Sequence, residues 1–395
     1  MQEDKQSGTS RPAAVLDIGS NTIRAGFGGQ TEPSVVMPSV VGRPRGETLD
    51  ERFSTTTTTM TRSGKTVYVG DDAQSKRGVL LMKRFIEYGV VTNFDELEAV
   101  WGHLFDEKLR VNISATPLLV AEGESMNPKC NREKLTQIAF ETFSVPHFFL
   151  ALSPALILAA AGRRTGLSVD LSDITRAVPV YEGYFLSHCV TRNWVNSLLV
   201  TEHLGKLLAR NNAGVSFQSR CNYDALIDIT KQLAYAAQDV DQEKETFGCS
   251  KEEQFKLPDG KVVTVGTERF ECAEPLFQPE LANVYGAGLA AHVVNTVRLC
   301  NADIRQELLS NVVLAGGGSS LAGLASRLQK EVETELMGHH DLSGMHVQVL
   351  APPGGDLLVW KGASLLASSP GFIDNCISSD EYEEYGPALV HRKCF

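Results

Sequence analysis

Apolar residues near the start of the chain form two short runs that flank a polar turn. The stretch AVLDIGSNTIRAGFGG, residues 14–29, begins apolar, breaks at residues 17–21 and then resumes with alternating apolar side chains. This pattern predicts two strands joined by a tight turn. Polar turns between strands are also common where nothing binds, so an ordinary β-hairpin is the alternative interpretation.

A similar pattern returns in the middle of the chain. Residues 166–184, GLSVDLSDITRAVPVYEGY, form an apolar run, an acidic turn with Asp170 and Asp173, and a second apolar run. Two such hairpins predict two lobes of similar architecture that face one another across a cleft.

The residue types in these turns suit phosphate chemistry. A turn of glycine, serine and asparagine can direct several backbone N–H groups at one point, which suits a phosphate. Asp17, at the end of the first predicted strand, would then hold a water bound to a metal ion. A third turn, AGGGSS at residues 315–320, follows a predicted strand at 311–314 and precedes a predicted helix at 321–336. Glycine-rich turns from strand to helix recur at phosphate sites, although three glycines alone are a weak signal.

Four further segments have patterns typical of single elements. Residues 96–109 carry apolar side chains at helical spacing, and residues 118–121 predict a short buried strand. Residues 131–143 begin with a capping asparagine and predict an amphipathic helix. The run FFLALSPALILAAA, residues 148–161, predicts a buried helix, because Pro154 is tolerated in a first helical turn.

Composition narrows the class of protein. The chain has 395 residues, more than one ordinary core requires, and 43% of them are hydrophobic. It has no apolar run of about 18 residues and no signal-peptide core at its start, so we expect a globular protein without a membrane span. Eight cysteines without a C-x-x-C motif predict reduced thiols in an intracellular protein. The net charge of −11 argues against a general nucleic-acid surface.

The segment at residues 46–67 is polar and unlike its surroundings. It contains five consecutive threonines at residues 55–59, which have β propensity but no apolar alternation to bury. We expect a mobile surface loop; the alternative is a phosphorylated or partner-binding loop.

Seven peptides resemble actin and lie in the same order along almost the whole chain. They are VGRPR (41–45), YVGDDAQSKRG (68–78), NREKLTQIAFETF (131–143), PVYEGY (179–184), LPDGKVVTVG (257–266), LFQP (276–279) and HRKCF (391–395). The resemblance implies an α/β fold of the kind that actin shares with the heat-shock chaperone ATPases, a ribonuclease H-like fold. Two similar lobes, each with a five-stranded sheet, would enclose a central nucleotide cleft that holds ATP or ADP with Mg²⁺ or Ca²⁺.

The resemblance also implies four subdomains. Subdomain 1 would comprise residues 1–38, 85–160 and 353–395, and subdomain 2 would comprise residues 39–84 with the extended threonine-rich loop. Subdomain 3 would comprise residues 161–196 and 285–352, and subdomain 4 residues 197–284.

By the same resemblance, the nucleotide and metal would be held at the turns. Asp17 and Asp170 would order metal-bound water. The phosphates would lie against Gly19, Ser20, Asn21, Arg24, Asp173, Gly316 and Gly317.

The two hairpin turns depart from the family pattern. In the first, Asn21 replaces a glycine and Arg24 replaces a lysine; arginine keeps the charge, but its planar fork is not interchangeable with an ammonium. The second turn, from Asp170 to Ile174, is shorter than the family's and lacks both of its glycines. A loop that needs glycine for close backbone approach loses that approach when β-carbons are added.

The catalytic positions depart further. The family's glutamine and histidine, which position the water that attacks the γ-phosphate, align with Ser153 and Arg176. Hydrolysis of this kind depends almost wholly on positioning and electrostatics, so losing both groups should remove most of the rate. Positions that would contact the base and ribose are also changed; they read Thr230, Lys231, Leu321, Asp356, Ser197 and Leu198.

Two classes of function remain. The first is a structural subunit of a cytoskeletal or nuclear multiprotein assembly, cytoplasmic or nuclear, with a degenerate nucleotide site and little or no ATPase activity. Its partners would be proteins, including actin or other actin-related proteins, with no direct nucleic-acid contact. The second is a working actin-like filament protein that binds and slowly hydrolyses ATP. The long polar loop at 46–67 and the changes at Tyr88 and Cys376 argue against a conventional filament.

Overall fold

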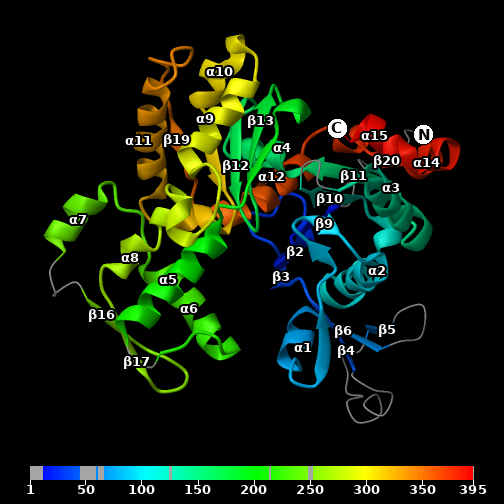
Figure 1. Cartoon of the computed structure of the whole chain (residues 1–395). Coiled ribbons are helices and arrows are strands. Elements are labelled where there is room, and N and C mark those ends of the chain that lie inside the picture. The colour runs from blue at the N-terminus through cyan, green and yellow to red at the C-terminus, as the bar shows by residue number, and fades with distance from the viewer. Residues whose placement is uncertain are drawn as a thin grey trace, which may run out of the picture. The chain divides into compact units, whose positions relative to one another are not determined.

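The computed structural model describes residues 12–44, 59–60, 66–123, 127–212, 215–247 and 252–394. The chain divides into two compact units (Figure 1). Unit 1 comprises Met1–Leu156 and Val359–Phe395, and unit 2 comprises Ile157–Leu358. The division into four subdomains stays a prediction, as does the facing arrangement of the two hairpins. Nearly all of the loop at 46–67 lies outside the described residues.

Unit 1 is built on a six-stranded sheet. Its order is β20 (Ile377–Ser378), β11 (His147–Leu152), β10 (Leu118–Glu122), β1 (Ala14–Ile18), β2 (Thr22–Phe27) and β3 (Val35–Pro38). The predicted N-terminal hairpin is confirmed, since β1 pairs antiparallel with β2 and parallel with β10. Ala14, Val15 and Leu16 are fully buried. Strands covered on both faces have continuous apolar sequences, which explains the unbroken run at the start of the hairpin.

Helices and small sheets complete unit 1. The helices are α1 (Gly70–Ser75), α2 (Phe94–Gly102), α3 (Lys129–Gln137), α13 (Phe372–Asn375), α14 (Ser379–Tyr385) and α15 (Val390–Lys393). Two more, α4 (Ser153–Ala160) and α12 (Leu358–Ala367), cross the boundary between the units. A four-stranded sheet contains β5 (Thr59–Met60), β6 (Thr66–Val69), β4 (Val41–Pro44) and β7 (Leu80–Lys83), and β8 (Ile86–Glu87) pairs with β9 (Val90–Val91). Helix α2 continues as a π-helix, His103–Lys108, and its predicted apolar stripe packs in the core through Trp101 and Phe105.

Two sequence predictions in unit 1 need correction. The run at 148–161 is not one helix, because its first part is β11 and the helix α4 begins at Ser153. A strand in the middle of a sheet has the same continuous apolar composition as a buried helix, so periodicity does not separate them. Pro154 does lie in the first turn of α4, as predicted. Helix α3 begins before Asn131, whose side chain is hydrogen-bonded to the carbonyl of Val91 instead of capping the helix.

Unit 2 repeats the central topology of unit 1. Its six-stranded sheet contains β14 (Tyr184–Phe185), β13 (Thr175–Tyr181), β12 (Gly166–Leu171), β18 (Val312–Ala315) and β19 (Val349–Leu350), with β15 (Thr191–Asn193) paired to β13. Strand β12 pairs antiparallel with β13 and parallel with β18, as β1 does with β2 and β10. The predicted likeness of the two hairpins is therefore confirmed, whereas each sheet has six strands instead of five.

Unit 2 also contains seven α-helices and a separate pair of strands among its described residues. They are α5 (Ser197–Asn211), α6 (Arg220–Leu233), α7 (Val240–Thr246), α8 (Glu268–Glu271), α9 (Leu289–Leu299), α10 (Ala302–Leu309) and α11 (Leu324–Met337), and the paired strands β16 (Glu253–Lys256) and β17 (Val262–Val265). Helices α9 and α11 lie side by side (Figure 1). Helix α11 begins at Leu324, later than predicted, because residues Gly317–Ser320 form a 3₁₀ turn first.

No helix among the described residues is long and apolar enough to span a membrane. Cys130 is exposed and Cys189, Cys272, Cys300, Cys376 and Cys394 are buried, and each of these is a free thiol.

Candidate functional site

The turn between β1 and β2 brings an aspartate and an arginine together. Asp17 and Arg24 are direct partners in the antiparallel register, so their side chains project from the same face of the sheet. A guanidinium nitrogen of Arg24 lies 3.3 Å from Oδ2 of Asp17. At the tip of the turn, Oγ of Ser20 accepts a hydrogen bond from the backbone N–H of Gly89 at 3.0 Å. The carbonyl of Asn21 accepts one from the N–H of Ser39, so the turn is held on both sides.

The turn between β12 and β13 repeats this pair. Asp170 and Arg176 are again direct partners in the register, and Nη1 of Arg176 lies 3.4 Å from Oδ2 of Asp170. The hydroxyl of Ser172 donates to the other carboxylate oxygen, Oδ1, at 2.5 Å. Both oxygens of Asp170 are therefore contacted from within its own hairpin. The carbonyl of Asp173 accepts from Asn196, whose side chain also caps helix α5.

The glycine-rich turn after β18 approaches Asp170. Gly316 has a φ of +79°, and a β-carbon there would collide with Oδ1 of Asp170 and with the backbone of Leu171. The positive φ and the close approach of Asp170 both favour glycine at this position. A β-carbon at Gly317 would meet no atom within 4 Å. Of the two predicted glycines, only Gly316 is thus required by a close approach.

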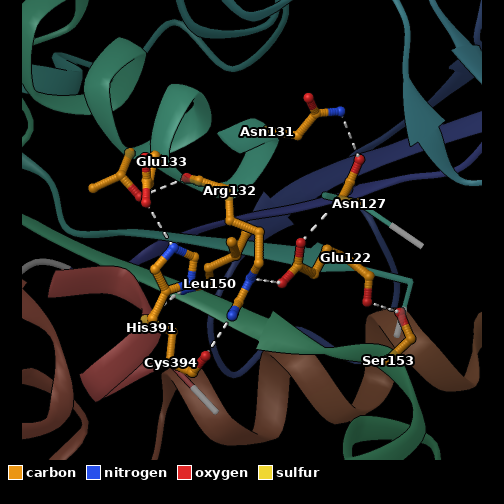
Figure 2. A network of polar contacts seen from close by, with 10 residues as sticks. Glu122, Asn127, Asn131, Arg132, Glu133, Leu150, Ser153, His391 and Cys394 are labelled. Carbon is orange, nitrogen blue, oxygen red and sulfur yellow. Dashed lines mark hydrogen bonds and ion pairs between the residues drawn. The ribbon is translucent and has the colours of Figure 1, made fainter. Parts of the chain in front are cut away.

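Ser153, at the predicted water-positioning place, is tied to the backbone of unit 1. Its hydroxyl donates a 2.7 Å hydrogen bond to the carbonyl of Glu122, the last residue of β10 (Figure 2). The Glu122 side chain is buried and lies 2.5 Å from Nε of Arg132. Burial raises the pKa of Glu122 to about 7, although the positive charge of Arg132 opposes that shift.

The same network reaches the C-terminal residues. Arg132 also donates to the carbonyl of Cys394, and the thiol of Cys394 accepts from the N–H of Leu150 at 3.4 Å (Figure 2). Sequence reasoning missed this network. Arg132 and Cys394 are separated by 262 positions, so no local pattern connects them.

Arg176 differs chemically from the histidine that the resemblance implies at its place. A guanidinium is always charged and donates hydrogen bonds without accepting any. A neutral imidazole can accept a proton, whereas Arg176 cannot, and one of its nitrogens lies against Asp170.

The predicted base and ribose positions all lie in unit 2. The hydroxyl of Thr230 donates within helix α6 to the carbonyl of Leu226, and Lys231 is exposed. Leu321 is half-buried against the core of unit 2, and Asp356 and Leu198 are exposed. Ser197 lies against Gly318, so the start of α5 adjoins the glycine-rich turn.

A family model described as Actin matches residues 8–395, nearly the whole chain. The chain belongs to the actin family. This agrees with the two α/β units and with the repeated hairpins. Actin-family proteins typically bind a nucleotide with a divalent metal ion.

The carboxylates of both turns are engaged by other side chains, and their part in metal binding stays a prediction. In the part of the chain that the structure describes, no three His, Cys, Asp or Glu side chains gather as a metal site. Both oxygens of Asp170 are contacted by Ser172 and Arg176, and Asp17 is paired with Arg24. The phosphate-binding roles of the residues in the turns stay predictions of this actin-family resemblance.

Proposed function

We propose that this actin-family protein is a structural subunit of a multiprotein assembly, cytoskeletal or nuclear, and that it has little or no ATPase activity. The observation that carries the proposal is the set of contacts made by Ser153 and Arg176, the residues at the two predicted water-positioning places. The hydroxyl of Ser153 is committed to a backbone carbonyl, and Arg176 is committed to Asp170. We therefore expect neither side chain to orient a water for attack on a phosphate.

The alternative is a working filament protein that hydrolyses ATP slowly. It is supported by the first turn, where Gly19 and Ser20 keep the glycine and the serine of the family and Arg24 keeps a positive charge beside Asp17. These groups suit phosphate binding, but binding without a positioned water does not produce turnover.

Phosphate release from Mg-ATP by the purified full-length chain tests the proposal. We expect a rate at the level of the blank, with a conventional actin preparation as the positive control. The double variant Ser153→Gln, Arg176→His restores the family's residue types and is the matched comparison. Phosphate release by the wild-type chain at the actin rate would overturn the proposal.

Assembly is tested separately. In a conventional filament, the loop at residues 46–67 would enter a neighbouring subunit. Fixing a polar loop there costs about 1–2 kcal/mol of backbone entropy per residue, and its polar side chains return little hydrophobic gain. We therefore expect no long homopolymers from the intact chain in polymerising salt, by sedimentation and electron microscopy, with and without residues 53–63. Abundant helical filaments would favour the alternative. Affinity capture with mass spectrometry would identify the protein partners.

A further inference from the structure

The same charge arrangement occurs independently in the two units. In each, an aspartate at the end of the first hairpin strand lies directly across the ladder from an arginine. The distances are 3.3 Å for Asp17 and Arg24 and 3.4 Å for Asp170 and Arg176. Because both pairs follow from strand register, the arginines are held opposite their carboxylates by the sheet itself.

Each pair is only slightly exposed. The exposed fractions of the side chains are 15% and 11% for Arg24 and Asp17, and 7% and 17% for Arg176 and Asp170. Removing one partner of such a pair leaves a charge that is poorly solvated, so the pairs resist opening. In unit 2 the hydroxyl of Ser172 adds a second bond to the carboxylate of Asp170.

A divalent cation would have to compete with these contacts. Mg²⁺ at a phosphate site is held directly or through water by one or two carboxylates, whose negative charge supplies most of the attraction. A guanidinium beside the carboxylate cancels that charge and repels the incoming cation. Arginine stays charged at every accessible pH, so the repulsion is permanent.

We propose that neither turn takes a divalent cation, because Arg24 and Arg176 hold the carboxylates that would receive it. A phosphate group that enters either turn is then bound without metal. The inference concerns cation binding, and it stands apart from the proposed lack of ATP hydrolysis.

Binding of Mn²⁺ to the full-length chain, followed by electron paramagnetic resonance, tests the proposal. We expect no saturable Mn²⁺ binding by the wild-type protein. Arg176→Gln and Arg24→Gln each remove the guanidinium beside one carboxylate and should tighten Mn²⁺ binding at least about tenfold, because the negative charge of that carboxylate is no longer offset. Arg163→Gln, at an exposed position in unit 2, removes the same charge and is the matched control.

Two further variants separate charge from folding defects. Arg176→Lys and Arg24→Lys keep the positive charge and should bind Mn²⁺ as weakly as the wild type. Thermal unfolding of every variant shows whether the fold is kept. Stoichiometric Mn²⁺ binding by the wild type would overturn the proposal. So would folded glutamine variants that bind Mn²⁺ no more tightly than Arg163→Gln does.

Nucleotide binding gives a second readout. Any affinity of the wild type for fluorescent ATP should be the same in EDTA and in Mg²⁺; an affinity that requires Mg²⁺ contradicts the proposal. That result would leave the proposed absence of turnover intact, since phosphate release is measured separately.

Discussion

Arg132 and Glu122 form an ion pair inside unit 1, with Nε of Arg132 2.5 Å from Oε1 of Glu122. The pair joins the end of β10 to helix α3, and Arg132 extends it to the carbonyl of Cys394. Glu122 in turn holds Ser153 through its backbone carbonyl. The C-terminal residues are thus linked through one arginine to the end of β10, where the carbonyl of Glu122 binds Ser153 at the start of helix α4.

Replacing Arg132 should destabilise unit 1 strongly. Arg132→Met removes the partner of the buried Glu122 carboxylate and a bond to the carbonyl of Cys394, and breaking a buried pair in this way costs about 3–5 kcal/mol above about pH 7, where Glu122 is charged. Urea unfolding followed by circular dichroism measures the loss. Lys129→Met, at an exposed position of the same helix, is the control and should change stability by less than about 0.5 kcal/mol.

A double variant tests whether Arg132 and Glu122 act as a pair. The double variant Arg132→Met, Glu122→Leu removes both charges and should be more stable than Arg132→Met alone, because no buried charge is left uncompensated. If the double variant loses as much free energy of unfolding as the two single variants together, Arg132 and Glu122 do not stabilise unit 1 as a pair.

Glu122 should make the stability of unit 1 depend on pH. Its pKa in the folded state, about 7, lies above its ordinary value of 4.5, so the folded state takes up the proton more readily. The stabilisation is complete below the unfolded-state pKa and is lost as pH rises through about 7. We expect a fall on the order of 1–3 kcal/mol between about pH 5 and pH 8, and Glu122→Gln should flatten it.

Urea unfolding midpoints at a series of pH values measure this effect. Glu383→Gln, at an exposed position of α14, removes a carboxyl without burial and should keep the wild-type profile. Equal pH profiles for Glu122→Gln and the wild type would count against the raised pKa.

The two adjacent glycines after β18 should respond differently to alanine. Gly316→Ala meets both a positive φ and the carboxylate of Asp170, so it should destabilise unit 2 by about 1–3 kcal/mol. Gly317→Ala meets open space and should stay within about 0.5 kcal/mol of the wild type. Thermal unfolding compares the pair; equal losses for both would show that the approach of Asp170 does not matter.

Ser153 should contribute to stability. Ser153→Ala removes its hydrogen bond to the carbonyl of Glu122, for which we expect a loss of about 0.5–1.5 kcal/mol. Ser114→Ala, at an exposed position in unit 1, is the control. The proposed role predicts unchanged phosphate release in both variants; a fall in phosphate release with Ser153→Ala alone would point to catalysis instead.

Local pattern was sufficient for the two hairpins. Their alternation, their polar turns and the spacing of Asp17 from Arg24 lie within a few residues, so a tight turn already implies which residues pair across the ladder. The long actin-like peptides likewise gave the family and the fold. Pattern was insufficient at 148–161, because an apolar run buried on all sides has no period to distinguish strand from helix.

Only the tertiary structure decided what the polar side chains contact. The sequence, through its resemblance to actin, predicted Ser153 and Arg176 at the places of the catalytic residues, but not that Ser153 binds the carbonyl of Glu122 or that Ser172 completes the contacts of Asp170. The Arg132 link to Cys394 spans 262 positions. Such contacts depend on how the sheet and helices pack, and side-chain partners brought together by packing leave no periodic trace in the sequence.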